Sequence, residues 1–254
     1  LPGMKAQQNP FLNIEAANYA DSMANKMIAQ ISLKEKITLL AGDKYFKLRT
    51  GIPFIFKGHL SNAIINRSNK KFNLPALVFT DGPRGVVTTP QPNFPAPITR
   101  ASTWNPVLEK QVGTAMACEA KFAGSNLIGA PCINLLRHPA NGRAQESYGE
   151  DPFLVSQFGV AMVNGIQDEG VMACVKHFAL NSIENMRYTI DVKITNKVLH
   201  EVYLPHFKAI VDAGAASVMS AYNKVNGKYC AENKMLLTDI LRKQWNFKGF
   251  VQSD

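Results

Sequence analysis

Five groups of polar side chains stand directly after short apolar runs in this sequence, and their residue types suit hydrogen bonding to a hydroxyl-rich ligand. They occupy residues 81–85, 137–146, 176–177, 220–223 and 253–254, and they bring together Asp, Arg, Lys, His and Tyr side chains. The groups lack metal-ligand spacing, and no Gly-rich phosphate loop follows the first apolar run. Charged groups make strong, directional hydrogen bonds to neutral hydroxyls. A sugar is therefore the natural candidate ligand, with no metal and no cofactor.

The apolar runs that precede these groups predict a parallel sheet. They cover residues 76–80, 126–134, 171–179, 216–222 and 249–253, and helical patterns lie between them. Strands that alternate with helices are typical of parallel α/β folds. Polar side chains at the carboxyl ends of successive parallel strands indicate the active-site face of a barrel. The alternation alone fits an open doubly wound sheet or a (β/α)8 barrel, and the strand-end groups favour the TIM-barrel-like fold.

Capping signals predict where the helices begin and end. A capping box at residues 32–35 precedes an apolar run, and residues 42–73 are irregular enough to indicate a long connection or insertion. Polar N-cap candidates stand at Asn105, Asp151 and Thr195, and glycines expected to end helices stand at Gly124, Gly170 and Gly214. The helices therefore fall between the predicted strands.

Taken singly, several of the polar residues have ordinary structural interpretations. Asp81 before Gly-Pro is typical of a turn, and Arg84 is typical of a surface cation. Arg143 and Glu146 are spaced to pair across a loop. Lys176 is less ordinary, because a lysine at the end of a buried strand needs an acidic partner.

The histidines divide into one site candidate and three others. His177 is either a core histidine or a member of the site, whereas His138, His200 and His206 lack comparable neighbours in the sequence and are assigned structural roles.

The overall composition excludes several classes of protein. The net charge is +9 in 254 residues, but the basic side chains are scattered and no nucleic-acid motif accompanies them, so we expect no nucleic-acid partner. The four cysteines are too widely spaced for zinc and are interpreted as free structural thiols. No apolar run is long enough for a membrane span. The absence of a signal-peptide core favours the cytoplasm, and the start at Leu1 leaves export open.

Several blocks of the sequence, in order, resemble the β-glucosidases of glycoside hydrolase family 3. The blocks are Asp-Gly-Pro at 81–83, Gly-Arg at 142–143 with Glu-Asp-Pro at 150–152, residues 176–181, residues 218–223 with Asn-Gly at 226–227, and residues 249–254. The resemblance runs from about residue 32 to the end of the sequence. Several blocks in the family's order are much more specific than any one motif.

The resemblance implies a retaining mechanism with Asp254 as the nucleophile that attacks the anomeric carbon. It implies that the sugar hydroxyls are hydrogen-bonded by Asp81, Arg143, Lys176 and His177, and that Met219 and Tyr222 line the pocket wall. We expect the ionised form of Asp254 to be favoured by Lys176, by His177 if it is protonated, and by the Tyr222 hydroxyl.

The sequence also departs from the family pattern. Many members carry a second arginine after the Asp-Gly-Pro block, where this sequence has Val86-Val87, and Arg187 is either a loop residue or a sugar contact. In the family the acid/base glutamate lies in a second α/β-sandwich domain. No residue of this chain is therefore assigned as the general acid, and capping or pairing with cations is expected for Glu146, Glu150, Glu184, Glu201 and Glu232.

We therefore interpret residues 1–254 as the N-terminal part of such an enzyme, with an arm or helix over 1–31 and a barrel over 32–254 that is incomplete at its C-terminal end. The remaining barrel elements and the second domain, normally in the same chain, are expected to be absent. The predicted activity is that of a retaining, exo-acting β-glucosidase on terminal, glucose-like, β-linked residues of a glycoside or oligosaccharide. The alternative is a catalytically incomplete fragment or a non-catalytic carbohydrate-binding remnant.

Overall fold

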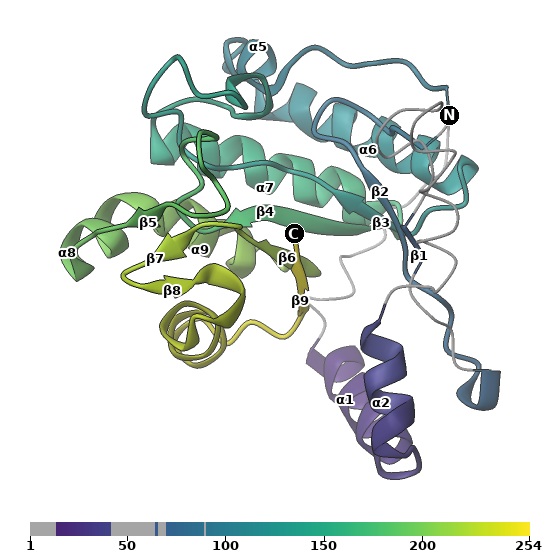
Figure 1. Cartoon of the computed structure of the whole chain (residues 1–254). Coiled ribbons are helices and arrows are strands. Elements are labelled where there is room, and N and C mark those ends of the chain that lie inside the picture. Colours follow the sequence, from purple (N-terminus) through teal and green to yellow (C-terminus); the bar gives the residue numbers. More distant parts are fainter. Residues whose placement is uncertain (1–13, 42–63, 66–69, 89) are drawn as a thin grey trace, which may run out of the picture.

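The computed structural model describes residues 14–41, 64–65, 70–88 and 90–254, and its centre is a curled six-stranded sheet (Figure 1). The strands, in their spatial order, are β1 (Ile64–Ile65), β2 (Val78–Asp81), β3 (Leu127–Gly129), β4 (Met172–Phe178), β6 (Ser217–Ser220) and β9 (Phe250–Ser253). All neighbouring pairs from β2 onward are parallel, and only β1 is antiparallel to its neighbour. Spatial order follows chain order without the reversal of a doubly wound sheet, so the barrel alternative is correct.

The sheet register aligns the side chains that matter for the site. Lys176 on β4 is paired with Met219 on β6, which is paired with Gln252 on β9. Because neighbouring residues of a strand point to opposite faces, aligned positions in adjacent parallel strands share a face. These three side chains therefore lie in one row. A small apolar cluster adjoins it and consists of Phe79, Leu127, Cys174 and Met219.

Helices between the strands cover the outer face of the sheet and contribute to the main core. The helices between β2 and β4 are α5 (Pro97–Ala101), α6 (Pro106–Phe122) and α7 (Pro152–Asp168). Between β4 and β6 lie α8 (Asn196–Val198), a π-helical turn (Leu199–Tyr203) and α9 (Pro205–Asp212). A π-helix (Met235–Gln244) precedes β9. The predicted N-caps Asn105, Asp151 and Thr195 all accept backbone hydrogen bonds from the first turn of their helices. The three predicted terminal glycines all have positive φ angles, as C′ positions require.

Helices α6 and α7 approach each other closely through glycine. A Cβ atom on Gly165 would lie 2.2 Å from the carbonyl oxygen of Lys110, and one on Gly113 would lie 2.7 Å from that of Met162. Backbone atoms cannot move aside as a flexible side chain can, so both positions require glycine. The close packing fixes α7, which leads directly into β4 and the site.

A second, three-stranded sheet lies beside the main one and was not predicted. It consists of β5 (Asp191–Val192), β7 (Lys224–Val225) and β8 (Lys228–Tyr229). β7 and β8 form a hairpin whose two turn residues, Asn226 and Gly227, have φ angles of 49° and 90°. Asn-Gly is the preferred pair for such a turn. The Asn-Gly pair was therefore a turn signal in the sequence. The strands on either side have only two residues each, which is too short to show a strand pattern.

The N-terminal segment forms two successive helices, α1 (Ile14–Ala29) and α2 (Leu33–Leu40) (Figure 1). The predicted capping box is confirmed, since Ser32 and Glu35 bond each other's backbone N–H groups. Short 3₁₀ turns occupy Lys70–Phe72, Ala144–Glu146 and Cys230–Glu232. Most of the predicted irregular connection, 42–73, lies outside the described residues. None of the described helices is sufficiently long and apolar to cross a membrane.

Candidate active site

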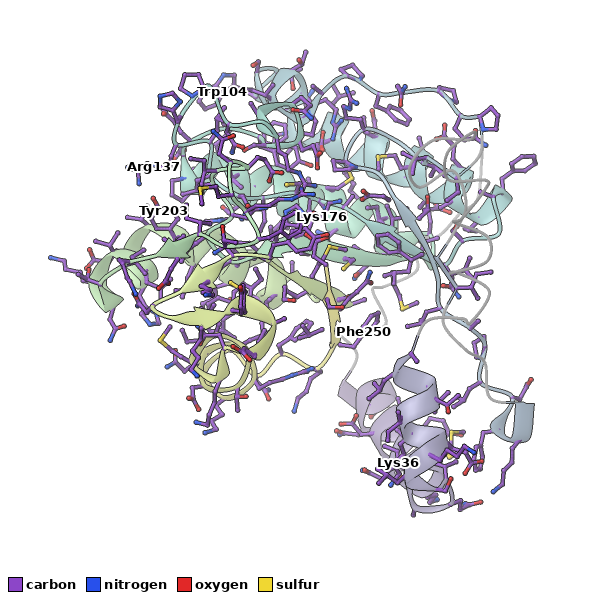
Figure 2. The ribbon with its side chains drawn as sticks, viewed as in Figure 1. Lys36, Trp104, Arg137, Lys176, Tyr203 and Phe250 are labelled. Atoms are coloured by element: carbon purple, nitrogen blue, oxygen red, sulfur yellow. The ribbon has the colours of Figure 1, made fainter. Side chains whose placement is uncertain are left out.

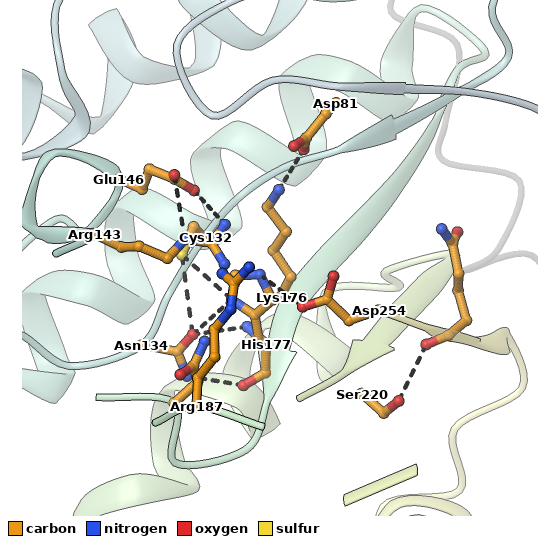
Figure 3. Close-up of polar contacts among 12 residues, drawn as sticks. Asp81, Cys132, Asn134, Arg143, Glu146, Lys176, His177, Arg187, Ser220 and Asp254 are labelled. Carbon is orange, nitrogen blue, oxygen red and sulfur yellow. Dashed lines mark hydrogen bonds and ion pairs between the residues drawn. The ribbon is translucent and has the colours of Figure 1, made fainter. Parts of the chain in front are cut away.

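A cavity of about 430 Å³ opens at the carboxyl ends of the parallel strands. Figure 2 shows Lys176 near the middle of the molecule, and Figure 3 shows the polar side chains converging around it. The lining includes all seven residues predicted from the sequence, namely Asp81, Arg143, Lys176, His177, Met219, Tyr222 and Asp254. It also includes Phe79, Glu146, Glu184, Arg187, Gln252 and Ser253. The fold thus brings residues from six separate segments to one place.

Lys176 has the acidic partner that its position requires. Its Nζ donates to Asp81 Oδ1, and its side chain is only 2 % exposed. Burial lowers the pKa of Lys176, but the carboxylates of Asp81 and Glu146 outweigh this effect and raise the pKa above its ordinary value, so the lysine is a cation. Gly129 on the neighbouring strand makes room for the pair, because a Cβ there would lie 2.7 Å from Asp81 Oδ1.

Two further cations in the lining are held by glutamates. Arg143 donates to both carboxylate oxygens of Glu146, at 2.7 and 3.3 Å, and Arg187 donates to Glu184 at 2.7 Å. The expected pairing of Glu146 and Glu184 with cations is confirmed. These glutamates also line the cavity, which was not predicted.

Arg187 connects the loop before β5 to the tyrosine beside Asp254. Its guanidinium lies 4.9 Å from the ring centroid of Tyr188 and 4.8 Å from that of Tyr222. The two tyrosine rings meet edge to face, with centroids 4.7 Å apart. Tyr222 hydrogen-bonds to Asp254, and burial together with that carboxylate raises the pKa of Tyr222 to about 12. The tyrosine is therefore a protonated donor toward Asp254.

The pKa of Asp254 shifts in the opposite direction to the expectation. Its side chain is 18 % exposed, and burial raises the pKa above the ordinary aspartate value. The Tyr222 hydrogen bond and the cations Lys176, Arg143 and Arg187 lower the pKa, but they do not offset burial completely. Lys176 and Tyr222 lower the pKa of Asp254, as predicted from the sequence. The predicted net direction of the pKa shift was wrong, because desolvation of the carboxylate was not included.

His177 is not the cation that was considered. Its side chain is 1 % exposed, and burial, followed by Arg143, Lys176 and Arg187, lowers its pKa well below the ordinary value. The imidazole is therefore neutral at neutral pH. Its Nε2 lies 3.5 Å from Asp254 Oδ2.

A buried ion pair behind the site supports the Asp-Gly-Pro loop. Arg100 and Glu109 form two hydrogen bonds of 2.8 and 3.0 Å, and the Tyr148 hydroxyl donates to Glu109 at 2.5 Å. Arg100 also donates to the carbonyl oxygens of Pro83, at 3.1 Å, and Pro95, at 2.5 Å. These bonds fix the loop that follows Asp81.

The remaining predictions can be placed as well. Arg84 is exposed, as a surface cation would be, and His206 is buried beside Phe207. His138 and His200 are exposed. All four cysteines are free, and three of them are buried. Within the described residues, no group of three or more His, Cys, Asp or Glu side chains is placed to hold a metal ion.

Sequence reasoning missed some contributors to the site. It left Arg187 undecided, although a guanidinium between two aromatic rings is a common arrangement. It gave no role to Asn134, which hydrogen-bonds to His177 (Figure 3). No local signal identifies Asn134, because its contact is with a residue 43 positions away.

Comparison with known families agrees with this geometry. Residues 57–254 match the family description "Glycosyl hydrolase family 3 N terminal domain". The chain belongs to glycosyl hydrolase family 3. The N-terminal domain of this family has a TIM-barrel-like fold, of which the curled parallel sheet is a part.

Relatives of this family 3 chain include β-glucosidases from several organisms. A β-glucosidase from Bacteroides ovatus is 41 % identical over 199 residues, which cover 72 % of this chain and 27 % of the relative. One from Rhizobium radiobacter is 36 % identical over 240 residues, which cover 91 % of this chain and 27 % of that protein.

Solved structures of the family show the same fold. β-Glucosidase 3B from Thermotoga neapolitana, in complex with glucose, matches with a TM-score of 0.81 at 38 % identity, over 91 % of this chain and 33 % of that one. A Kluyveromyces marxianus β-glucosidase, also in complex with glucose, matches with a TM-score of 0.81 at 31 % identity, over 91 % and 26 %. The chain thus spans about a quarter to a third of the length of these relatives.

Proposed function

We propose that this chain carries the nucleophile and the sugar-binding part of a retaining, exo-acting β-glucosidase. The observation that carries the proposal is the convergence of seven residues from five separate segments on one cavity, with Asp254 beside Tyr222 and His177. The similarity to β-glucosidases, two of them solved in complex with glucose, supports a terminal glucose-like residue as the substrate.

In the proposed first step, a carboxylate oxygen of Asp254 attacks the anomeric carbon while the glycosidic C–O bond breaks, and the departing oxygen takes a proton from a general acid. Water then gives a proton to the same acid/base residue, attacks the anomeric carbon of the glycosyl-enzyme and breaks the bond to Asp254, which leaves as a carboxylate. The Tyr222 hydroxyl and the nearby cations hold the carboxylate in place and favour its ionised form.

The glycone hydroxyls are proposed to bind the charged groups of the cavity. Asp81, Glu146 and Glu184 each pair with a cation, so these carboxylates are oriented as hydrogen-bond acceptors and their partners as donors. Hydrogen bonds that strengthen as the sugar ring flattens stabilise the oxocarbenium-like transition state.

The acid/base residue is proposed to lie outside this chain, in a second domain of the whole protein. The other carboxylates of the lining, Asp81, Glu146 and Glu184, are each engaged by Lys176, Arg143 or Arg187. That arrangement suits anchoring of a ligand better than proton donation to a leaving group. The 254-residue chain by itself is then expected to bind a sugar and to turn over little substrate.

The test is Asp254→Asn in the longest form of the protein that its gene encodes, assayed on an aryl β-glucoside. A loss of kcat on the order of a thousandfold or more is expected, because the amide cannot form the glycosyl-enzyme. Asp212→Asn is the matched control, since Asp212 pairs with Lys208 on the exposed face of α9. Wild-type turnover by Asp254→Asn would refute the assignment of the nucleophile.

A covalent label separates the enzyme from a sugar-binding remnant. A 2-deoxy-2-fluoro-β-glucoside with a good leaving group should accumulate as a glycosyl-enzyme, detected by mass spectrometry on the peptide that contains Asp254. A protein that binds glucose but neither turns over nor takes the label would instead be the non-catalytic alternative.

A further inference from the structure

Asn134 and His177 hold each other through two reciprocal hydrogen bonds. The Asn134 Nδ2 group donates to the carbonyl oxygen of His177 at 2.8 Å, and the His177 backbone N–H donates to Asn134 Oδ1 at 2.9 Å. A carbonyl only accepts and a backbone N–H only donates, so these two bonds fix which end of the amide is oxygen. Both residues are buried, with Asn134 6 % exposed.

The same amide oxygen also faces the imidazole ring. His177 Nδ1 lies 3.0 Å from Asn134 Oδ1. A bare Nδ1 would place two lone pairs against each other at that distance, whereas a protonated Nδ1 makes a hydrogen bond. The contact therefore favours the tautomer with the proton on Nδ1.

Two neighbours could favour the other tautomer, and both lie farther away. Cys132 Sγ lies 3.8 Å from Nδ1, where an S–H group is a weak donor. Asp254 Oδ2 lies 3.5 Å from Nε2, which is beyond the usual range of an N–H···O hydrogen bond. The 3.0 Å contact to Asn134 is thus the strongest of the three.

Burial and the surrounding cations together disfavour the doubly protonated ring. Desolvation is the largest effect that lowers the pKa of His177, and Arg143, Lys176 and Arg187 lower it further. The ring then carries one proton. The nitrogen that holds this proton decides whether Nε2, on the cavity side of the ring, is a hydrogen-bond donor or an acceptor.

We propose that Asn134 is a positioning residue that keeps His177 in its Nδ1-protonated form, so that Nε2 presents a lone pair to the cavity beside Asp254. Nε2 and the Asp254 carboxylate are then two acceptors 3.5 Å apart with no proton between them. A hydroxyl group that donates to Nε2 completes this arrangement. On the basis of the proposed function, that donor is a hydroxyl group of the bound sugar.

The tautomer can be measured without any activity. In protein labelled with ¹⁵N-histidine, two-bond ¹⁵N–¹H correlation spectra distinguish a protonated from a bare ring nitrogen, and a His177→Gln variant identifies the signal. The expected result at neutral pH and without ligand is a protonated Nδ1 and a bare Nε2. A protonated Nε2 would overturn the proposal whether or not the protein is a glucosidase.

Variants test whether Asn134 sets the tautomer. In Asn134→Leu the ring loses its nearest acceptor, and the proton is expected to move to Nε2, where Asp254 is the remaining acceptor. Asn134→Asp keeps an oxygen in place and should retain the Nδ1 proton, which provides a second reading if Asn134→Leu does not fold. Cys132→Ala is the matched control, since it changes the other neighbour of Nδ1 and should leave the tautomer unchanged. A tautomer that responds to Cys132→Ala and not to the Asn134 variants would refute the role of Asn134.

The ligand consequence is tested with glucose and its monodeoxyfluoro analogues, measured by calorimetry. Neither a fluoro nor a deoxy sugar can donate a hydrogen bond at the substituted position, but fluorine carries lone pairs that repel a bare Nε2, whereas hydrogen does not. The fluoro analogue substituted at the position that faces Nε2 should therefore bind at least about tenfold more weakly than the matching deoxy sugar. In Asn134→Leu, where Nε2 becomes a donor, that difference should shrink or reverse. Equal binding of fluoro and deoxy analogues at every position would refute the acceptor role, while absence of glucose binding altogether would count against the proposed function and leave the tautomer result standing.

Discussion

The buried Arg100–Glu109 ion pair gives the sharpest stability prediction, because it connects two helices to the loop that follows Asp81. The two side chains are 4 % and 0 % exposed, and Arg100 makes four hydrogen bonds, two to Glu109 and two to backbone carbonyls. Arg100→Met removes all four and leaves the Glu109 carboxylate buried with only the Tyr148 hydroxyl as a partner.

An unpaired buried charge costs about 3–5 kcal/mol. Domain stabilities are about 5–15 kcal/mol, so this single change removes a large part of the total. With a urea slope of about 2–3 kcal/mol/M, the unfolding midpoint should fall by roughly 1–2.5 M. The double variant Arg100→Met with Glu109→Leu removes both charges, and its cost should be at least about 2 kcal/mol smaller than the sum of the two single variants.

The assay is urea unfolding followed by circular dichroism for the wild type, both single variants and the double variant. Lys110→Met is the matched control, because Lys110 pairs with Asp168 at 2.7 Å but with side chains 47 % and 21 % exposed. Its cost should stay below about 1 kcal/mol. The reasoning fails if Arg100→Met costs no more than Lys110→Met, or if the double variant costs the full sum.

Two predictions concern pH. Arg187 lowers the pKa of Asp254, so Arg187→Met should move the acid limb of the pH profile of kcat/KM to higher pH. Arg187→Lys keeps the positive charge and should move the acid limb less. An unchanged acid limb in Arg187→Met would contradict the proposed electrostatic role. Burial lowers the pKa of His206 to about 3. As the pH falls below about 6.5, His206 is therefore protonated in the unfolded chain but not in the folded chain, and the free energy of unfolding decreases. Between pH 7 and 5 the loss should be about 2 kcal/mol greater for the wild type than for His206→Gln in denaturant titrations, whereas His200→Gln, at an exposed position, should behave like the wild type. Identical pH dependence in wild type and His206→Gln would contradict this account.

Much of the fold could be predicted from local patterns. Helix starts at Asn105 and Asp151 are local because a cap bonds backbone groups within three residues of itself. The parallel strands were found because each is a short apolar run and all but the last are followed by a helical pattern. The predicted strand at 126–134 was too long, since ladder pairing ends at Gly129 and a single bridge between Cys132 and Lys176 continues it.

What the sequence by itself determined was the set of chemical groups and the order in which they reach one edge of the sheet. Strand periodicity and parallel order are properties of neighbouring residues, and they bring Asp81, Lys176 and Asp254 to the same face. The family resemblance, carried by the same strand-end blocks, agreed with this set.

Only the tertiary structure decided the directions of the pKa shifts and the partners of the side chains. The pKa of Asp254 rises and His177 is neutral because burial removes water from both, and burial depends on how distant segments pack. Asn134 reaches His177 across 43 positions of sequence, and no local pattern specifies that contact. Hydrogen bonding and desolvation act through space between residues that are distant in the sequence. They can therefore be determined only from the folded structure.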